Sequence, residues 1–210
     1  MGALGFYDVR DYGAVGNGIA NDTTSIQQAI NAAAASTDQG GTVFFERGSY
    51  LISSTLTVPA RVRLLGVLGF LQDFSTSLNF VGSGTAIQFT GDYSGIEGVG
   101  IVTTTGATGV DTNGGTSLTF REMNIRGFSL RGVRCAGSFR VLFHRVHIQN
   151  APSGGNGIVA TERFNQNVID NCAFTCVSGQ SWTAIDIGTV GAMSSSGSCI
   201  LNSIFQAADR

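Results

Sequence analysis

The chain has 210 residues, of which 42% are hydrophobic and 12% are charged, so it is long enough for one domain with a sizeable core and too apolar for a disordered protein. Its net charge is −2, and its 12 cationic residues are all arginines. Such a chain lacks a basic surface that could neutralise many phosphates, so nucleic acid is not an expected partner. Frequent Ser, Thr and Asn with 30 glycines favour short strands and tight turns over helices.

Targeting segments and cysteines narrow the class further. No apolar run reaches the roughly 18 residues of a membrane span, and residues 1–13 lack the features of a signal peptide. We therefore expect no membrane insertion and no signal peptide in the chain as given. The cysteines have neither the spacing nor the neighbouring histidines of a zinc site, so we expect buried free thiols, with a disulfide as the alternative, and no metal or other cofactor. These cysteines are Cys135, Cys172, Cys176 and Cys199.

Residues 1–41 predict an N-terminal segment with one short capping helix. Asn21 or Asp22 can begin this helix, and we interpret Asp22 as its N-cap rather than as a catalytic acid. The apolar face consists of Ile26, Ala29, Ile30 and Ala33, and the helix ends near Gly40. Such a helix before β structure covers a strand edge that would otherwise invite aggregation. Residues 42–45, 50–58 and 61–65 then supply the first, less regular strands.

From residue 87 onward the sequence repeats with a period of about two dozen residues. In one series of five segments, an apolar residue is followed by two residues of any type, a second apolar residue, one residue of any type and a third apolar residue. These segments begin at Ile96, Phe120, Phe143, Ile169 and Ile200. A second alternating pair precedes each of these, beginning at Ile87, Val110, Val133, Ile158 and Ile185. The two series keep step, and a period of this length decides the architecture of a protein.

A unit of two short strands cannot bury its own apolar face, but stacked units can. We therefore predict an all-β fold: a single-stranded right-handed parallel β-helix of about seven coils, which forms one continuous domain over residues 42–210. A propeller needs longer blades, and the strands of a sandwich would not recur in a fixed register. The insertions at residues 176–184 and 188–198 should project as loops on one side.

Three runs near the N-terminus carry a family resemblance. Residues 8–33, 40–59 and 62–66 read DVRDYGAVGNGIANDTTSIQQAINAA, GGTVFFERGSYLISSTLTVP and VRLLG. They resemble the opening of the pectate lyase superfamily of right-handed β-helix proteins, which includes polygalacturonase-like and rhamnogalacturonase-like enzymes and phage tailspikes or depolymerases. The resemblance implies a long acidic or neutral polysaccharide as partner and, from the phage members, a homotrimer in a virion or outside the cell. The catalytic motifs of the polygalacturonase-like branch and of calcium-dependent pectate lyases are missing from this sequence.

The repeat also places side chains that point outward. Asp111 and Arg134 should be neighbours at roughly 5 Å, as a lyase-style base with a charge neutraliser or as a surface ion pair. His144 beside Asp170 has the best acid/base geometry, because a carboxylate one rung away would orient the imidazole; a solvated pair on a turn is the alternative. His147 has no carboxylate beside it, and we expect it to be exposed.

Other outward residues predict contacts between rungs. Glu122 with Arg145 and Glu97 with Arg121 are expected to pair by charge and so fix the register. Asn171 above Asn202 suggests a short amide ladder. These predictions are structural and not catalytic.

A binding groove is predicted from Glu162, Arg163, Trp182 and Asp186, which fall on adjacent coils beside the longest insertions. Sugar rings present apolar faces that pack on aromatic side chains, so an exposed Trp182 would bind a sugar, whereas a half-buried one would serve packing. Glu162 and Asp186 are candidate catalytic carboxylates, since glycosidases hold two of them roughly 5 to 9.5 Å apart.

Three functions follow from these residues. The first is a tailspike-like protein that acts on a bacterial surface polysaccharide, either by binding it alone or by binding and degrading it. The second is a non-catalytic structural or adhesion module of a virion fibre. The third is a pectin-type hydrolase or lyase acting on cell walls, which the missing motifs disfavour. We also expect a homotrimer, in which neighbouring chains cover the final rung.

Overall fold

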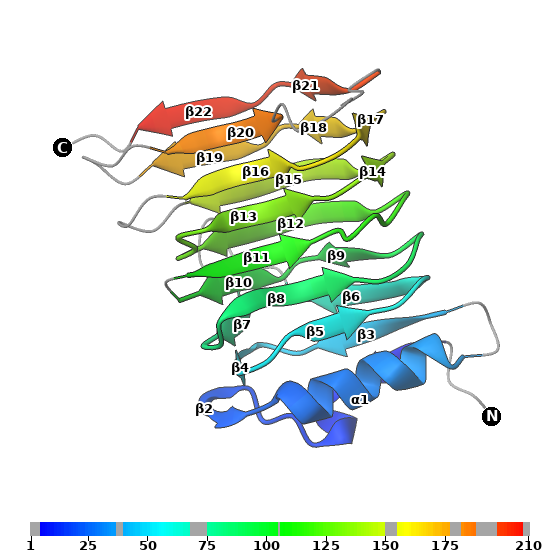
Figure 1. The fold of residues 1–210 in the computed structure, drawn as a ribbon. Helices are drawn as coiled ribbons and strands as arrows, with labels where there is room; N and C mark the ends of the chain where they lie inside the picture. Colours follow the sequence, from blue (N-terminus) through cyan, green and yellow to red (C-terminus); the bar gives the residue numbers. More distant parts are fainter. Residues whose placement is uncertain are drawn as a thin grey trace.

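Parallel strands stacked along one axis make up most of the chain, as Figure 1 shows. The structure is a computed structural model that describes residues 5–36, 40–67, 75–104, 106–149, 155–176, 182–187 and 197–207. Within these ranges the strands form sheets of 14, 6 and 2 strands. We call the first two the large sheet and the small sheet.

The large sheet has two halves that meet at a bend. Its first half contains β1 (Phe6–Asp8), β3 (Gly41–Phe45), β6 (Val62–Gly66), β9 (Gly95–Glu97), β18 (Val168–Asp170) and β21 (Cys199–Leu201). Its second half contains β2 (Asn17–Asn21), β4 (Gly48–Ile52), β7 (Thr76–Phe80), β10 (Gly100–Thr103), β19 (Ala173–Cys176) and β22 (Ile204–Ala207). Two long strands, β12 (Thr119–Arg126) and β15 (Leu142–Gln149), run through both halves.

The small sheet and a short third sheet close the coils. The small sheet contains β5 (Leu56–Val58), β8 (Gly84–Phe89), β11 (Ala107–Asp111), β13 (Arg131–Cys135), β16 (Asn156–Ala160) and β20 (Thr183–Ile187). The third sheet pairs β14 (Ser138–Phe139) with β17 (Phe164–Asn165). Each coil therefore passes through the large sheet, the small sheet and a narrow third side before the next coil begins.

The register confirms the repeat that the sequence predicts. Phe120 lies opposite Ile96 on one side and Phe143 on the other. Val133 lies between Val110 and Ile158 in the same way. Every described strand pair is parallel and joins consecutive coils, so the chain is a single-stranded parallel β-helix.

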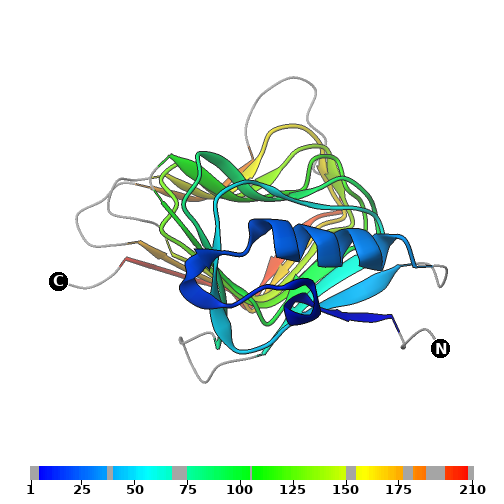
Figure 2. The ribbon, with the colours of Figure 1, turned by 90° about the horizontal axis from the view of Figure 1, so that it is seen from below.

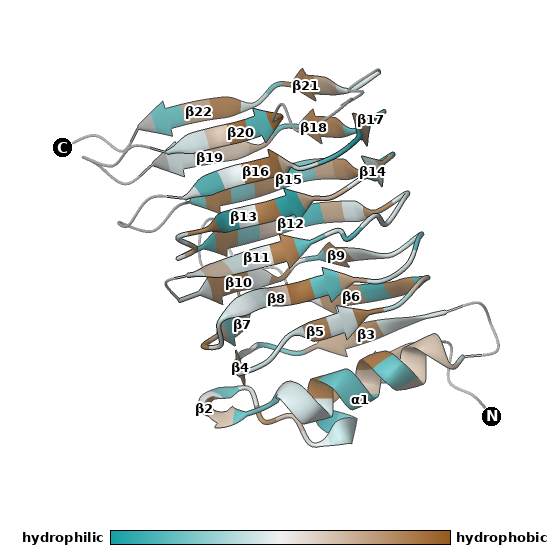
Figure 3. Cartoon of the chain, viewed as in Figure 1, coloured by the Kyte–Doolittle hydropathy of each residue, from teal (hydrophilic) through white to brown (hydrophobic). Residues whose placement is uncertain are grey.

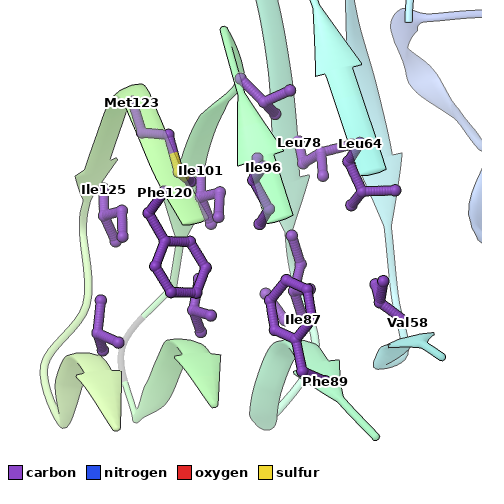
Figure 4. Packing of buried hydrophobic residues seen from close by; sticks show 14 of the residues in the cluster. Val58, Leu64, Leu78, Ile87, Phe89, Ile96, Ile101, Phe120, Met123 and Ile125 are labelled. Atoms are coloured by element: carbon purple, nitrogen blue, oxygen red, sulfur yellow. The ribbon is translucent and has the colours of Figure 1, made fainter. Parts of the chain in front are cut away.

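The interior is a set of apolar ladders that run along the stack. Figure 4 shows Leu64, Ile96 and Phe120 pointing into the space between the two sheets. The rings of Phe120 and Phe143 stack with centroids 5.0 Å apart. Each fully buried side chain of this size contributes about 1.5–3 kcal/mol by leaving water, so the ladders hold the coils together. Figure 3 shows the resulting alternation of hydrophobic and hydrophilic residues along strands such as β13.

The cap at the N-terminal end contains the predicted helix. α1 (Thr23–Ala34) crosses the end of the stack in Figure 2 and buries Ile26, Ala29 and Ile30. A short 3-10 helix, η1 (Val9–Tyr12), packs beside it. Residues 1–41 also supply β1 and β2, which pair with β3 and β4 of the large sheet.

The expected role of the Asp22 side chain was wrong. Asp22 occupies the N-cap position, but its carboxylate makes no capping hydrogen bond. It is buried and accepts hydrogen bonds from the backbone N–H groups of Val15, at 2.7 Å, and Gly16, at 3.1 Å. Asn21 accepts from the backbone N–H of Thr23 instead, at 3.1 Å. Asp22 therefore fixes the loop before β2, and Asn21 supplies the cap.

A column of left-handed residues bends the large sheet. Glu122, Arg145, Asn171 and Asn202 have φ values of 49°, 55°, 52° and 46°. Each occupies the same place in its coil, between the two halves of the sheet. Residues other than glycine rarely adopt this left-handed backbone conformation, and among them Asn tolerates it best. The expected amide ladder was only partly right: the two asparagines share the column, but Asn202 donates its hydrogen bond to Asp170.

The last described coil leaves apolar side chains exposed. Phe205 stacks on Phe174 with centroids 5.0 Å apart, yet 54% of Phe205 is exposed. Cys199 in the same coil is exposed, so the prediction of buried thiols fails there, while Cys135 and Cys172 are buried and free. The side chain of Cys176 and most of the predicted insertion loops lie outside the described residues. Within the described ranges, no helix has the length and apolarity needed to cross a lipid bilayer.

Candidate functional site

The outer face of the large sheet carries a row of charged side chains on successive coils. Glu97, Arg121, His144 and Asp170 occupy equivalent register positions on β9, β12, β15 and β18. We call these four residues the charged column. Each follows an inward-pointing Ile or Phe, so strand alternation turns its side chain outward. The repeat therefore predicted the column correctly.

His144 and Asp170 form the upper end of the charged column. Nδ1 of His144 lies 3.1 Å from Oδ2 of Asp170, and the two side chains are 32% and 26% exposed. Nδ2 of Asn202 donates to the other carboxylate oxygen of Asp170, also at 3.1 Å. Asp170 is thus held between two coils, and it can orient the imidazole so that Nε2 is available to a ligand.

Arg121 is the cation of the charged column that is left without a counter-ion. We expected Glu97 to pair with Arg121, but Glu97 forms its salt bridge with Arg63 on β6. Arg121 is exposed, and among the described residues no hydrogen bond or ion pair engages its guanidinium. Glu122 and Arg145 pair as predicted, with Oε1 of Glu122 and Nη1 of Arg145 2.7 Å apart. Arg121 is therefore ready to bind an anionic group.

A hollow of about 510 Å³ lies beside Arg121. Its lining includes Arg63, Tyr93, Glu97, Ser117 and Thr119. Tyr93 is 67% exposed and has a φ of 59° at the turn before β9. The Tyr93 ring therefore offers an exposed aromatic surface beside the guanidinium groups of Arg63 and Arg121. Sequence reasoning missed Tyr93 and Arg63; an aromatic residue flanked by polar residues and glycines, as in GDYSG, was the signal for Tyr93.

His147 lies on the second half of β15 and is partly buried, which corrects the prediction that it is exposed. It occupies the predicted column between Asn124 and Ala173. Nε2 of His147 lies 2.8 Å from Oγ1 of Thr175. Burial lowers the pKa of His147. Its neutral form is therefore favoured, and we assign it a structural role.

Asp111 and Arg134 lie opposite one another on the small sheet, as predicted. Oδ2 of Asp111 lies 2.8 Å from Nη1 of Arg134. The Asp111 side chain is only 5% exposed, so this is not a solvated surface pair. Its other oxygen accepts from the backbone N–H of Asn113 at 2.9 Å. A carboxylate with both oxygens engaged and shielded from water is suited to fixing a turn.

Among the described residues, no hydrogen bond or ion pair joins the four residues of the predicted groove. Glu162 is exposed, and its Oε2 lies 2.9 Å from where a Cβ on Gly137 would stand, so it leans toward the coil below. Asp186 lies on the coil above, beside Val159. Trp182 is half-buried and packs against the core near Gly157, in the manner of a packing residue.

Arg163 lines a second, smaller hollow on the narrow third side. No described contact joins it to Trp182 or Asp186. Among the described residues, no three His, Cys, Asp or Glu side chains gather as a metal site.

Comparison with known proteins agrees with this architecture. Residues 6–207 match the family described as rhamnogalacturonase A/epimerase, pectate lyase-like. The chain belongs to this family. The match extends over the coils that carry the charged column, beyond the N-terminal runs on which the resemblance was first seen.

Individual relatives of this pectate lyase-like chain match it over shorter stretches. Mannuronan C5-epimerase AlgE2 of Azotobacter vinelandii is 40% identical over 67 residues, which cover 29% of this chain and 6% of that protein. Plasmin and fibronectin-binding protein A of Streptococcus pneumoniae is 45% identical over 56 residues, which cover 27% and 8%. ORF18 of Geobacillus virus E2 has a TM-score of 0.50 at 14% identity, over 97% of this chain and 61% of that one. The last likeness shows the fold alone, and the chain spans less than a tenth of the two sequence relatives.

Proposed function

We propose that this pectate lyase-like chain binds an extended acidic polysaccharide along the charged column. The observation that carries the proposal is the unpaired guanidinium of Arg121 between the Tyr93 hollow and the His144–Asp170 pair. A sugar ring can pack on Tyr93 while a carboxylate of the polymer binds Arg121. The face is long and rigid, with outward side chains repeating every coil at about 4.8 Å. Such a surface suits a polymer of repeated units.

The same geometry supports proton transfer. With a sugar carboxylate neutralised by Arg121, the proton on the carbon that bears it becomes more acidic, and His144 on the next coil is placed to accept it. Asp170 acts as a positioning residue, because it touches His144 and not the sugar. The electron pair left on that carbon forms a double bond to the neighbouring carbon as the glycosidic C–O bond there breaks, and the departing oxygen takes a proton from water. This lyase-type reaction is favoured over hydrolysis by a pair of carboxylates. Glu162 and Asp186 thus remain candidates for a hydrolase only.

The biological setting follows from the family resemblance. We propose a bacterial surface glycan as the ligand and a tailspike-like role in a virion or outside the cell. A homotrimer, which the resemblance to the phage members implies, is part of this proposal. Sedimentation at micromolar concentration tests it: a trimer is expected, and a folded monomer would contradict it.

A non-catalytic structural or adhesion module is the second candidate. It is favoured by the salt bridges Arg63–Glu97 and Glu122–Arg145, which use up outward charges in contacts between coils. Such pairs fix the register and bind no ligand. Polymer that binds but is never cleaved or modified would favour this function.

Titration with polygalacturonate, mannuronan and neutral dextran tests the proposal. We expect the acidic polymers to bind and Arg121→Ala to weaken binding by about tenfold, as for one charge-assisted hydrogen bond. Arg47→Ala removes an exposed arginine near the cap and should change nothing. Absorbance of an unsaturated sugar then separates elimination from hydrolysis, which yields reducing ends alone. Equal binding of dextran and the acidic polymers would overturn the proposal.

A further inference from the structure

The narrow third side of the stack carries a hollow that is distinct from the Tyr93 hollow. It measures about 340 Å³ and lies where β14 and β17 pair. Thr116, Phe139 and Asn165 occupy equivalent positions on three successive coils there. Their side chains point outward, because the neighbouring Ser138 and Phe164 are buried. The hollow is lined by Phe139, Arg163, Thr116 and Gly137 among others.

Phe139 offers an aromatic surface in this hollow. The guanidinium of Arg140 stacks over its ring, 4.9 Å from the centroid, and Nε of Arg140 donates to Oε1 of Gln166 at 3.2 Å. Arg140 does not line the hollow, whereas Phe139 does. The stacked guanidinium therefore fixes the ring and leaves part of it facing the hollow. A ring already held in place loses little entropy when a ligand packs on it.

Two opposite charges stand beside the ring. Arg163 lines the hollow, and Glu162 leans over Gly137 at its edge, with Oε2 2.9 Å from the position of a Cβ there. Gly137 has a φ of 66°, so it fits this turn and leaves space for the carboxylate. Among the described residues, neither charged group is engaged in a hydrogen bond or ion pair. Exposed groups with free donors and acceptors at a preformed hollow are what a polar ligand requires.

We infer that this hollow is a second carbohydrate site, which takes a neutral sugar ring. The apolar C–H face of a pyranose packs on Phe139. Its hydroxyl groups both donate and accept, so one can donate to Glu162 while another accepts from Arg163. An acidic sugar is disfavoured because its carboxylate would lie close to Glu162. The hollow beside Arg121, by contrast, has a free cation while its carboxylate, Glu97, is paired with Arg63, so it selects an anionic sugar.

This inference rests on the proposal that the chain binds a polysaccharide, but it concerns another side of the coil. It predicts that the natural glycan contains neutral sugars as well as acidic ones. The two hollows are neighbours, because Thr116 lines this hollow and the next residue, Ser117, lines the Tyr93 hollow. Each can be removed by a substitution that leaves the other intact.

The experiment is an amide NMR titration of the full chain with single sugars. The neutral probes are the methyl glycosides of glucose, galactose, mannose and rhamnose, and the acidic probe is methyl galacturonate. We expect at least one neutral glycoside to shift the amides of Gly137, Phe139 and Arg163, with the affinity reduced about tenfold or more in Arg163→Ala. Phe139→Leu should have the same effect. The exposed Arg163 makes its variant safe for folding, and Arg47→Ala is the matched control.

The outcomes separate this inference from the proposed function. If no neutral glycoside shifts these amides, or if the shifts persist unchanged in Arg163→Ala, the second site is overturned. Methyl galacturonate should shift the amides of Tyr93 and Thr119 instead, and this response should disappear in Arg121→Ala. If a neutral glycoside shifts its expected amides in the natural chain but methyl galacturonate shifts none, the site on the charged column is overturned and the neutral site stands.

Discussion

His144 and Asp170 are 26 positions apart in the chain, yet Nδ1 of the imidazole lies 3.1 Å from Oδ2 of the carboxylate. One turn of the β-helix lies between them, so the coil spacing sets this distance. The same rule brings Asp111 to Arg134, which are 23 positions apart. The contacts between side chains of neighbouring coils therefore depend on which residues share a column.

The His144–Asp170 pair predicts a separation of binding from turnover. Asp170→Asn removes the charge that orients and supports the imidazole, so the rate on an acidic polymer should fall by about 10²-fold or more while binding changes little. His144→Gln should lower the rate at least as much. The pH dependence that His144 gives the rate should disappear in His144→Gln, which a purely structural role would not cause. Unchanged turnover in Asp170→Asn would remove the pair from the mechanism.

His147 predicts a pH-dependent term in stability. Burial lowers the pKa of His147 below the value of 6.5 expected in the unfolded chain. The unfolded state therefore binds the proton more tightly, and the free energy of unfolding falls as pH drops from about 6.5 toward the lowered pKa. Above that window the contribution is fully present. Denaturant unfolding at pH 7.5 and 5.5 should show a smaller loss for His147→Gln than for the natural chain; equal losses would refute the assignment.

The cysteines should differ in reactivity. Burial raises the pKa of Cys135 to about 12 and that of Cys172 to about 11, so both thiols stay protonated at pH 8 and react slowly. Cys199 is exposed and should be alkylated before Cys135 and Cys172. Peptide mass spectrometry after brief iodoacetamide treatment measures the order. Alkylation of Cys135 in the folded chain at the rate of Cys199 would contradict the buried ladder at that position.

Asp22 should matter more for stability than the residue that caps α1. Asp22→Ala removes the acceptor of the partly buried backbone N–H groups of Val15 and Gly16, and losing two hydrogen bonds to a charged group costs about 2–3 kcal/mol. Asn21→Ala removes one capping bond and should cost about 1 kcal/mol. Urea unfolding of the two variants compares them directly. A larger loss in the free energy of unfolding for Asn21→Ala than for Asp22→Ala would contradict this prediction.

Periodic residues were predictable, and residues that break the period were not. Phe120, Phe143 and Ile169 could be stacked from spacing alone, because inward side chains must repeat with the coil. The sequence predicts a Glu97–Arg121 pair because both residues are in the repeat; the actual partner of Glu97, Arg63, lies on β6, before the repeat begins at residue 87. The burial of outward side chains could not be predicted from spacing either, because it depends on which neighbouring side chains cover them, as the partly buried His147 shows.

The same limit explains the candidate site. Its column was visible in the sequence, but its hollow was not, because Tyr93 lies at a turn and takes no part in the alternation of the strands. Trp182 was a candidate for sugar binding only because aromatic side chains can pack on sugar rings. Its packing near Gly157 follows from a close approach between coils that spacing does not show.

The most direct measurement is a crystal structure of the chain with hexasaccharides of galacturonate and of mannuronate. The account predicts a sugar ring on Tyr93, a sugar carboxylate on Arg121 and a following unit beside His144. Both oligosaccharides bound away from the large sheet, or neither bound at saturating concentration, would contradict it.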